Sequence, residues 1–437
     1  MFQYINFRKI TDAVFEQMQT LGHVSNVYFH SKIHEYSKRL AETLPGNLKS
    51  IYLVNSGSEA NDLALLMARA YTGRFEVASL RNGYHGMTYQ TMGMVSNNCY
   101  KYPVPSAAGF VKTMNPNVYR GLWGGNKCRD SPVQTDRTCS CNEECEAGLR
   151  YVEQFEEELI NNVPKNNIAA FWAESTTGRW RNHTVQTGFG RTGDHFWGFE
   201  MHGIIPDIVT MAKGIGNGFP LAAVATTPEI AQALTKASHF NTFGGNPIGC
   251  TVGIAVLDII EEENLQENCI QVGTYLLLEL AKLKSKYTIF GDVRGKGLMI
   301  GVELVSNSET REPVSPQIFM KFWEYCRDRG VIIGKGGLNG NVRCFHNEYN
   351  YLHLHLMYSA TKHLSQPFLR QRTQPKAAAG VFEEYDIDTD KFQTKFANSE
   401  NYNVLEDVLR IKPPMCITKE DADFTVEVLE EAAKYVG

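Results

Sequence analysis

The stretch Asp207-Ile-Val-Thr-Met-Ala-Lys-Gly-Ile-Gly-Asn-Gly-Phe-Pro220 decides the expected fold class of this chain of 437 residues. Its short apolar run, rich in β-branched residues, is typical of a buried parallel strand. The run ends at Lys213, and Gly214, Gly216 and Gly218 follow at once. A lysine that is partly desolvated at the end of a core strand has a lowered pKa, and its amine can then attack a carbonyl group.

Three interpretations of this segment are open. Lysines that attack carbonyls form Schiff bases, most commonly with pyridoxal phosphate. Alternatively, the lysine simply leaves the strand for solvent, because strand ends are often charged. The glycines also resemble a dinucleotide-binding loop, but such a loop opens a helix and has a different spacing. Here Phe219-Pro220 intervenes and residues 221–226 have the pattern of another strand, so we disfavour a nucleotide site.

The composition bounds the class of protein. The length predicts more than one domain, and 43% hydrophobic with 21% charged residues is ordinary for a globular enzyme. A net charge of −5 gives no positive field for nucleic acid, and no apolar run has the length of a membrane span. We therefore expect small-molecule substrates, no nucleic acid and no membrane.

The cysteines and histidines give no clear metal signal. Four of the ten cysteines lie close together in the sequence, at Cys128, Cys139, Cys141 and Cys145. Their spacing matches no common zinc pattern, and no histidine lies among them, so the sequence favours reduced thiols and no metal. The histidines at 346, 353, 355 and 363 follow no ligand pattern either.

Apolar strand patterns alternate with helical patterns along the first half of the chain. Residues 51–55, 76–80 and 168–174 are predicted to be strands, and residues 149–160 an amphipathic helix. This alternation predicts an α/β fold with a mostly parallel sheet, in which ligands bind at the carboxyl ends of the strands. Four candidate residues lie at such ends: Ser58, Tyr84, Glu174 and Lys213.

A helix is predicted after the first of these strands. Ser56 and Glu59 have the spacing of a capping box, and Gly73 follows the last turn. The predicted apolar face consists of Leu63, Leu66, Met67 and Ala70. The same helix start exposes backbone N–H groups that suit a phosphate, although a plain helix cap explains the pattern equally.

With these residues in hand, the chain resembles the class III (fold type I) pyridoxal-phosphate aminotransferases, and among them most closely the mitochondrial alanine–glyoxylate aminotransferase 2 group. The resemblance runs from about residue 21 to residue 437 with two breaks. The motifs that carry it are Leu53-Val-Asn-Ser-Gly-Ser-Glu-Ala-Asn61, Tyr84-His-Gly86, Arg120-Gly-Leu-Trp-Gly-Gly125, Cys128-Arg-Asp-Ser-Pro-Val-Gln134, Val185-Gln-Thr-Gly-Phe-Gly-Arg191, Met211-Ala-Lys-Gly-Ile-Gly-Asn-Gly-Phe-Pro220 and Asn241-Thr-Phe-Gly-Gly-Asn-Pro247.

The resemblance implies a role for several residues around pyridoxal 5'-phosphate. Lys213 would hold the cofactor covalently and move the proton at the substrate α-carbon. Gly57 and Ser58 would bind the phosphate, and Thr242 would reach the same phosphate from the other subunit of a homodimer or higher homo-oligomer. Tyr84 would cover the pyridine ring, although without the resemblance an ordinary core tyrosine is the simpler interpretation.

The remaining implied roles concern the ring oxygen and the substrate. Gln186 would hydrogen-bond the phenolic oxygen of the cofactor. Arg410 would hold the substrate carboxylate as a bidentate fork, and Glu174 would pair with Arg410 when no substrate is bound.

The resemblance also implies a mitochondrial location. The first nine residues contain two basic residues, but the acidic residues Asp12 and Glu16 follow closely. Because transit peptides contain few acidic residues, this segment is not a convincing transit peptide.

Three stretches depart from the family's pattern. In relatives Ala-Asp-Glu precedes Val185, and its aspartate keeps the pyridine nitrogen protonated, whereas Asn182, His183 and Thr184 stand here. Residues 175–184 are too few for a helix crossover and a new strand, so both are expected to be missing. Relatives also have a further N-terminal portion, so residues 1–48 are interpreted as a shortened segment. Finally, an unpatterned insert occupies residues 343–408.

The expected organisation and function follow. Residues 49–285 are expected to form a large cofactor-binding domain, and residues 286–437 a smaller α+β domain that contains the insert.

The expected reaction is ping-pong transamination between an amino acid and a 2-oxo acid, with L-alanine as donor and glyoxylate as acceptor. The alternative is a cofactor-binding relative with impaired catalysis, because the segment with the ring-nitrogen aspartate is missing. A nicotinamide oxidoreductase is disfavoured by the loop spacing.

Overall fold

The computed structural model describes residues 7–97, 100–139, 141, 145–173, 184–336 and 408–437. All of the elements below belong to one compact unit, residues 1–341 with 405–437. The second unit, residues 342–404, contains nearly all of the predicted insert and lies outside the described residues.

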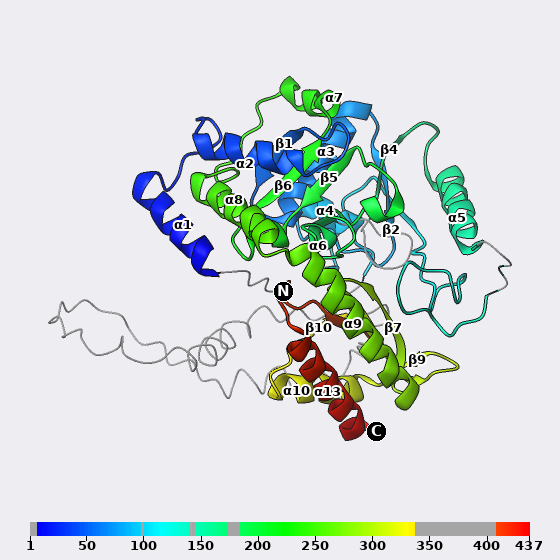
Figure 1. Cartoon of the computed structure of the whole chain (residues 1–437). Helices are drawn as coiled ribbons and strands as arrows, with labels where there is room; N and C mark the ends of the chain where they lie inside the picture. Colours follow the sequence, from blue (N-terminus) through cyan, green and yellow to red (C-terminus); the bar gives the residue numbers. More distant parts are fainter. Residues whose placement is uncertain (1–6, 98–99, 140, 142–144, 174–183, 337–407) are drawn as a thin grey trace, which may run out of the picture. The chain divides into compact units, whose positions relative to one another are not determined.

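The lysine segment lies in a three-stranded sheet with the order β1-β6-β5 (Figure 1). Its strands are β1 (Ser50–Val54), β6 (Ala222–Thr226) and β5 (Ile208–Met211). Both outer strands pair antiparallel with β6. Strand β5 was predicted to be a parallel strand, and this prediction is wrong for its pairing with β6. The reason is the short connection from β5 to β6, because a parallel crossover needs about a dozen residues or more.

A second sheet has the order β3-β2-β4, and both of its pairings are parallel. It consists of β3 (Phe110–Thr113), β2 (Glu76–Leu80) and β4 (Ile168–Trp172). Helix α3 (Gly57–Thr72) packs against β4, β5 and β6, and thus against both sheets. The α/β fold class is confirmed.

The stretch in which a helix and a strand were expected to be missing lies almost wholly outside the described residues. Among the described residues, β4 pairs with β2 alone and β5 with β6 alone. Residues 174–183, which lie between β4 and α6 (Thr184–Thr187) in the chain, are outside the described part. The predicted burial of β4 holds for Trp172 but is wrong for Phe171, which is 49% exposed.

Helices cover the sheets in the way that the apolar pattern predicts, with one correction. Leu63 and Met67 of α3 are buried, but Leu66 is 53% exposed and Leu65 is buried instead. The predicted helix end is confirmed, because Gly73 caps α3 with a left-handed φ of 66°. Helix α8 (Pro247–Glu262) is the most buried helix of this region, and α1 (Phe7–Thr20) and α2 (Ser31–Glu42) pack on it (Figure 1).

The C-terminal strands form an antiparallel sheet. Its order is β10-β11-β8-β7, with β9 beside β8. Helix α9 has residues in two separate hydrophobic clusters: Leu265 and Cys269 in the cluster around α8, and Leu276 and Leu283 in the cluster of this sheet. The elements are α9 (Leu265–Lys286), β7 (Phe290–Lys296), β8 (Met299–Asn307), β9 (Glu312–Pro313), α10 (Pro316–Asp328), β10 (Gly334–Gly336), β11 (Val408–Ile411) and α13 (Lys419–Val436).

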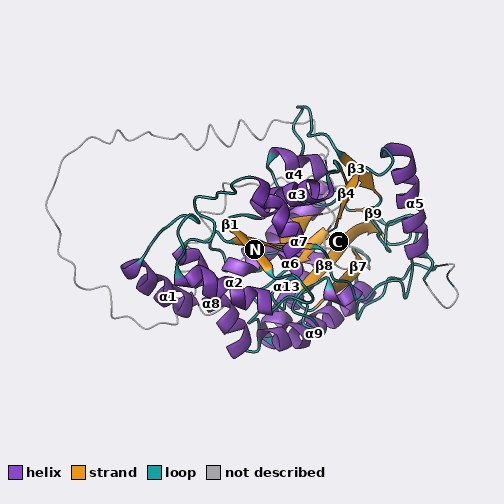
Figure 2. Ribbon diagram, turned by 90° about the horizontal axis from the view of Figure 1, so that it is seen from above, coloured by secondary structure: helices purple, strands orange, loops and turns teal. Residues whose placement is uncertain are grey.

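Short elements complete the described chain, together with α5, which packs beside β3 (Figure 2). They are α4 (Tyr89–Met94), α5 (Ala147–Asn162), η2 (Glu200–His202), η3 (Lys213–Gly216), α7 (Pro228–Ala231) and η4 (Gln232–Lys236). Among the described residues, no helix combines the length and the apolar composition needed to cross a membrane.

The long loop between β3 and α5, which we call the 114–146 loop, binds the C-terminal sheet through buried charges. Arg129 donates two hydrogen bonds to Asp292 of β7, at 3.0 and 2.7 Å, and both side chains are almost fully buried. Arg294 bridges Asp292 and Glu303 at 2.9 and 2.7 Å. Arg120 of the loop also pairs with Glu303. The sheet therefore contributes two buried carboxylates that hold the loop.

We expect Asp292→Ala to destabilise the protein by about 3–5 kcal/mol, because it leaves the buried guanidinium group of Arg129 without its carboxylate partner. Burial alone would raise the pKa of Asp292, but Arg294 and Arg129 hold that pKa below its ordinary value. The stabilisation is therefore complete above the unfolded-state pKa of about 3.9 and is lost as the pH falls below it. Urea unfolding between pH 3 and 7 measures both effects.

The exposed pair Arg8–Asp12 provides the control for this experiment. Asp12→Ala should cost less than about 1 kcal/mol. Equal losses in the two variants would contradict the importance of the buried network.

Candidate functional site

The site is built around Lys213, which follows β5 and begins η3. Its φ of 56° lies in the left-handed region, which residues other than glycine adopt at a cost of roughly 1–3 kcal/mol. Strain of this kind is concentrated at functional sites, where the surrounding structure maintains it. The expected desolvation of Lys213 is not found, because the residue is exposed.

The turn after Lys213 explains its conformation. Asn217 has a φ of 45° and Gly218 a φ of 101°, so the chain reverses through several left-handed residues before it enters β6. Segment η3 contacts α6, α8 and β6. The strand end therefore lies beside the helix that carries Gln186.

The start of α3 forms a second part of the site. Ser56 accepts a hydrogen bond from the N–H of Glu59 at 3.2 Å, as the predicted cap requires. The Glu59 carboxylate bonds to the N–H and side-chain amide of Asn55, at 2.7 and 3.0 Å, so the full capping box is not formed. Within the described chain, the N–H groups of Gly57 and Ser58 have no acceptor and remain available at the positive end of the helix.

The turn that contains Tyr84 packs directly on this helix start. Ser58 Oγ accepts a hydrogen bond from the N–H of Met87 at 3.2 Å, and Asn61 bonds to the carbonyl of His85 at 2.7 Å. Tyr84 is 36% exposed, and its ring lies 4.6 Å from that of Tyr100. The structure therefore brings Ser58 and the Tyr84 turn together, and it excludes the interpretation of Tyr84 as an ordinary core tyrosine.

The segment that carries Thr242 reaches the same helix start. Asn241 accepts a hydrogen bond from the Asn55 side chain at 3.1 Å, and it also caps the N–H of Gly244 at 2.7 Å. Thr242 itself is exposed. The sequence motifs contained Asn55 and Asn241, but a pattern within one segment cannot show that the two side chains meet.

The C-terminal strand β11 approaches the site from the smaller sheet. Lys412, directly after β11, donates a hydrogen bond to the side chain of Gln186. Arg191 supports the same junction by bonding to the carbonyls of Leu298 and Pro413, at 3.1 and 2.9 Å. Arg410 is two residues before Lys412, and alternate residues of a strand share a face. The sequence reasoning missed Lys412, although it stands in the segment quoted for Arg410.

One predicted substrate residue and one surface feature do not contribute to this picture. Glu174 lies outside the described residues.

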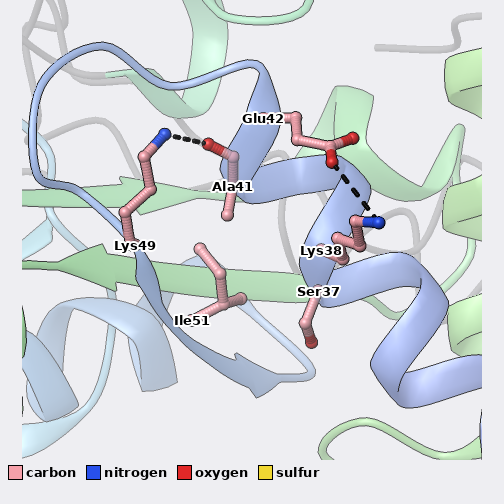
Figure 3. Close-up of a pocket in the computed structure, with 6 residues that line it drawn as sticks. All are labelled: Ser37, Lys38, Ala41, Glu42, Lys49 and Ile51. Carbon is pink, nitrogen blue, oxygen red and sulfur yellow. Dashed lines mark hydrogen bonds and ion pairs between the residues drawn. The ribbon is translucent and has the colours of Figure 1, made fainter.

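A depression of about 360 Å³ between α2 and β1 is lined by Lys38, Lys49 and Ile51 among others, and Lys49 donates a hydrogen bond to the carbonyl of Ala41 (Figure 3). It contains none of the predicted site residues, so we do not identify it as the active site.

A family model for class III aminotransferases matches residues 6–179 and 183–347. The chain belongs to this family, and the protein is an aminotransferase with the α/β fold of the fold type I enzymes.

Two relatives and two solved structures show the range of similarity. Human mitochondrial alanine–glyoxylate aminotransferase 2 is 49% identical over 356 residues, which cover 76% of this chain and 69% of that protein. The mitochondrial alanine–glyoxylate aminotransferase 2 homolog 2 of Arabidopsis thaliana is 38% identical over 445 residues, covering 96% and 74%. An aminotransferase from Bacillus anthracis is 26% identical, with a TM-score of 0.73 over 98% of this chain and 85% of that one. An (S)-enantioselective omega-transaminase from Thermomicrobium roseum is 25% identical, with a TM-score of 0.72 and the same coverage.

The close contact of the Tyr84 turn with α3 gives a testable consequence. A Cβ atom at Gly86, whose φ is 129°, would lie 2.5 Å from Ser58 Oγ and 2.9 Å from Ser58 Cα. We expect Gly86→Ala to displace the helix start, to destabilise the protein by roughly 1–3 kcal/mol, and to weaken the binding of pyridoxal phosphate. Chemical denaturation and a cofactor titration measure these effects.

Gly22→Ala is the matched control, because nothing lies within 4 Å of the added Cβ. It should leave both quantities nearly unchanged. If Gly86→Ala behaved in the same way, the contact between Ser58 and the Tyr84 turn would not matter for the site.

Proposed function

We propose that this aminotransferase transfers the amino group of L-alanine to glyoxylate, with pyridoxal phosphate linked to Lys213. One observation carries the proposal: a strained lysine at a strand end, in a chain that is 49% identical to the human mitochondrial alanine–glyoxylate enzyme. The products of this exchange are pyruvate and glycine. The mitochondrial location of the named relatives supports the same location for this protein.

The residues at the start of α3 fit the cofactor. The N–H groups of Gly57 and Ser58, at a positive helix end, suit its phosphate. Tyr84 would cover the pyridine ring, and Gln186 would bond to the phenolic oxygen. Gly86 supports the fit, because a side chain there would enter the space against Ser58. When bound, pyridoxal phosphate supplies an electron sink for the negative charge that develops at the substrate α-carbon.

The protein groups then position the substrate and move its proton. The amine of Lys213 would take the proton from the α-carbon of alanine and return one to the carbon that becomes the α-carbon of glycine. Arg410 would hold the carboxylate of either substrate in a bidentate pair. Glu174 would neutralise Arg410 between substrates. The hydrogen bond from Lys412 would fix the amide of Gln186 with its N–H groups turned toward an acceptor.

A homodimer is the second part of the proposal. Two segments meet at Asn26 and Asn241, whose side-chain oxygen and backbone N–H lie 3.4 Å apart, and His30 bonds to the carbonyl of Gly245 at 2.8 Å. The surface of these segments, which we call the apolar patch, has five side chains that are more than half exposed: Val27, Tyr28, Phe29, Phe240 and Phe243. Contiguous exposed apolar side chains mark interaction surfaces. Thr242 lies in the same segment and is exposed. In the dimer it would reach the phosphate of the partner's cofactor, as the resemblance to the family implies.

The function is tested with the purified chain, pyridoxal phosphate, L-alanine and glyoxylate. We expect formation of pyruvate and glycine, and a cofactor that borohydride fixes to Lys213. Lys213→Ala should abolish the fixed cofactor and lower turnover by a factor of roughly 10² to 10⁴ or more, because the proton-moving amine is gone. Mass spectrometry of tryptic peptides and a coupled pyruvate assay provide the measurements.

Lys236→Ala, at an exposed lysine of η4, is the control and should retain both properties. Cofactor fixed to another lysine in Lys213→Ala would overturn the assignment of Lys213. Turnover with other amino donors but none with alanine would overturn the proposed substrate and leave the cofactor site intact.

The apolar patch predicts the assembly state. We expect the wild-type chain to sediment as a dimer, and Phe243→Glu to weaken dimerisation by about 2 kcal/mol or more, because it buries an unpaired charge. Analytical ultracentrifugation over a concentration series measures this change. Ile160→Glu, at an 81% exposed residue of α5, should leave the dimer unchanged. A wild-type monomer, or dimers equally strong in both variants, would refute the role of the patch.

A further inference from the structure

Three cysteines of the 114–146 loop meet in space although their spacing in the sequence follows no common metal pattern. The Sγ atoms of Cys128, Cys141 and Cys145 all lie within 4.8 Å of one another. Two sulfurs bound to one tetrahedral zinc ion, each at about 2.3 Å, are separated by ~3.8 Å. Small side-chain movements therefore suffice to place all three sulfurs around one ion.

Cys139 lies beside this group. Its side chain interacts with Cys141 and lies near Cys128, and its Sγ atom is 3.6 Å from the carbonyl of Asn126. A Cβ atom added at Gly125 would lie 2.5 Å from the Cβ atom of Cys139, so Cys139 packs closely against this turn. Cys139 is not among the three sulfurs that lie within 4.8 Å of one another, so it would have to move closer to become the fourth ligand.

A backbone N–H group supports one of the three sulfurs. The N–H of Glu146, directly before α5, donates to the sulfur of Cys141 at 3.3 Å. Hydrogen bonds from surrounding groups to the ligands are a regular feature of metal sites. Cys128 is buried and the other two cysteines are half-buried, so the group lies at the edge of the protein interior.

We propose that Cys128, Cys139, Cys141 and Cys145 bind one structural zinc ion. Four thiolates around a closed tetrahedral site are the preferred environment of Zn²⁺ among the common cellular metals. Each thiol releases one proton to solvent when it binds, and no oxidant or reductant takes part. No substrate position remains open, so the ion stabilises structure and does not take part in amino transfer.

The position of the cluster explains what the ion would do. The 114–146 loop has no helix or strand among its described residues, and loops of this length require a further constraint. Arg129, next to Cys128, forms the buried pair with Asp292, and Asp130 pairs with Lys296 at 2.7 Å. A zinc ion would join the 125–128 turn to the start of α5 and so keep Arg129 in place against the C-terminal sheet.

The full chain, purified without chelators, tests the proposal by metal analysis. We expect about one zinc ion per chain, in line with a closed four-thiolate site. Cys128→Ser, Cys141→Ser and Cys145→Ser should each lose the zinc. Cys326→Ser, which changes a buried cysteine of α10, should retain it. Zinc that persists in all three cluster variants would overturn the proposal.

Two measurements keep the result independent of folding defects in the variants. Replacing zinc by cobalt in the wild-type chain should give the intense visible bands of a tetrahedral thiolate site. Cys139→Ser should shift these bands, and an unchanged spectrum would overturn the assignment of Cys139 as the fourth ligand. Alkylation of the native wild-type protein should leave the four cysteines unmodified until a chelator is added. Disulfides among them, or free thiols in a zinc-free protein, would overturn the zinc site.

Discussion

The rest of the site depends on the tight connection between β5 and β6. The two strands pair antiparallel, with Met211 opposite Ala223, so the chain must reverse direction within residues 212–222. Lys213, Asn217 and Gly218 take left-handed conformations to achieve this. Strand β1 pairs with the other edge of β6. The position of β6 therefore also determines where β1 ends and where α3 begins. The strained lysine and the helix start are therefore positioned by one set of backbone hydrogen bonds.

Local patterns in the sequence predicted the elements well. The strand near Lys213, the cap at Ser56 and the end of α3 at Gly73 all depend on neighbouring residues, and all are found. The direction of β5 was predicted wrongly because strand composition was given more weight than the shortness of the following connection. The prediction that Leu66 is a core residue is wrong, because Leu66 lies on an exposed face of α3. The helical period of apolar residues shows that a buried face exists, but it does not show how far around the helix that face extends.

Contacts between distant segments could not be predicted from one sequence. The bonds from Asn55 to Asn241 and from Lys412 to Gln186 join residues that are far apart in the chain. The cysteine cluster could not be predicted either. The spacing of cysteines in a sequence indicates a metal site only when one short element supplies the ligands. Here Cys128 belongs to the 125–128 turn and the other two precede α5, so the fold of the loop brings them together. The buried pair of Arg129 and Asp292 then holds this loop against β7.

Cofactor binding and assembly would be coupled through the segment 240–245. One side of it bonds to Asn55, whose N–H and side chain also bind Glu59 in the first turn of α3. The other side exposes Phe240 and Phe243. A partner subunit that contacts this segment would also hold Asn241 as the acceptor for Asn55, and with it the helix start proposed to bind the phosphate. By linkage, if dimerisation strengthened cofactor binding by this route, the cofactor would strengthen the dimer by the same coupling free energy. In the proposed dimer the exposed aromatic rings would therefore belong to the cofactor site as much as to the interface, because one short segment presents both.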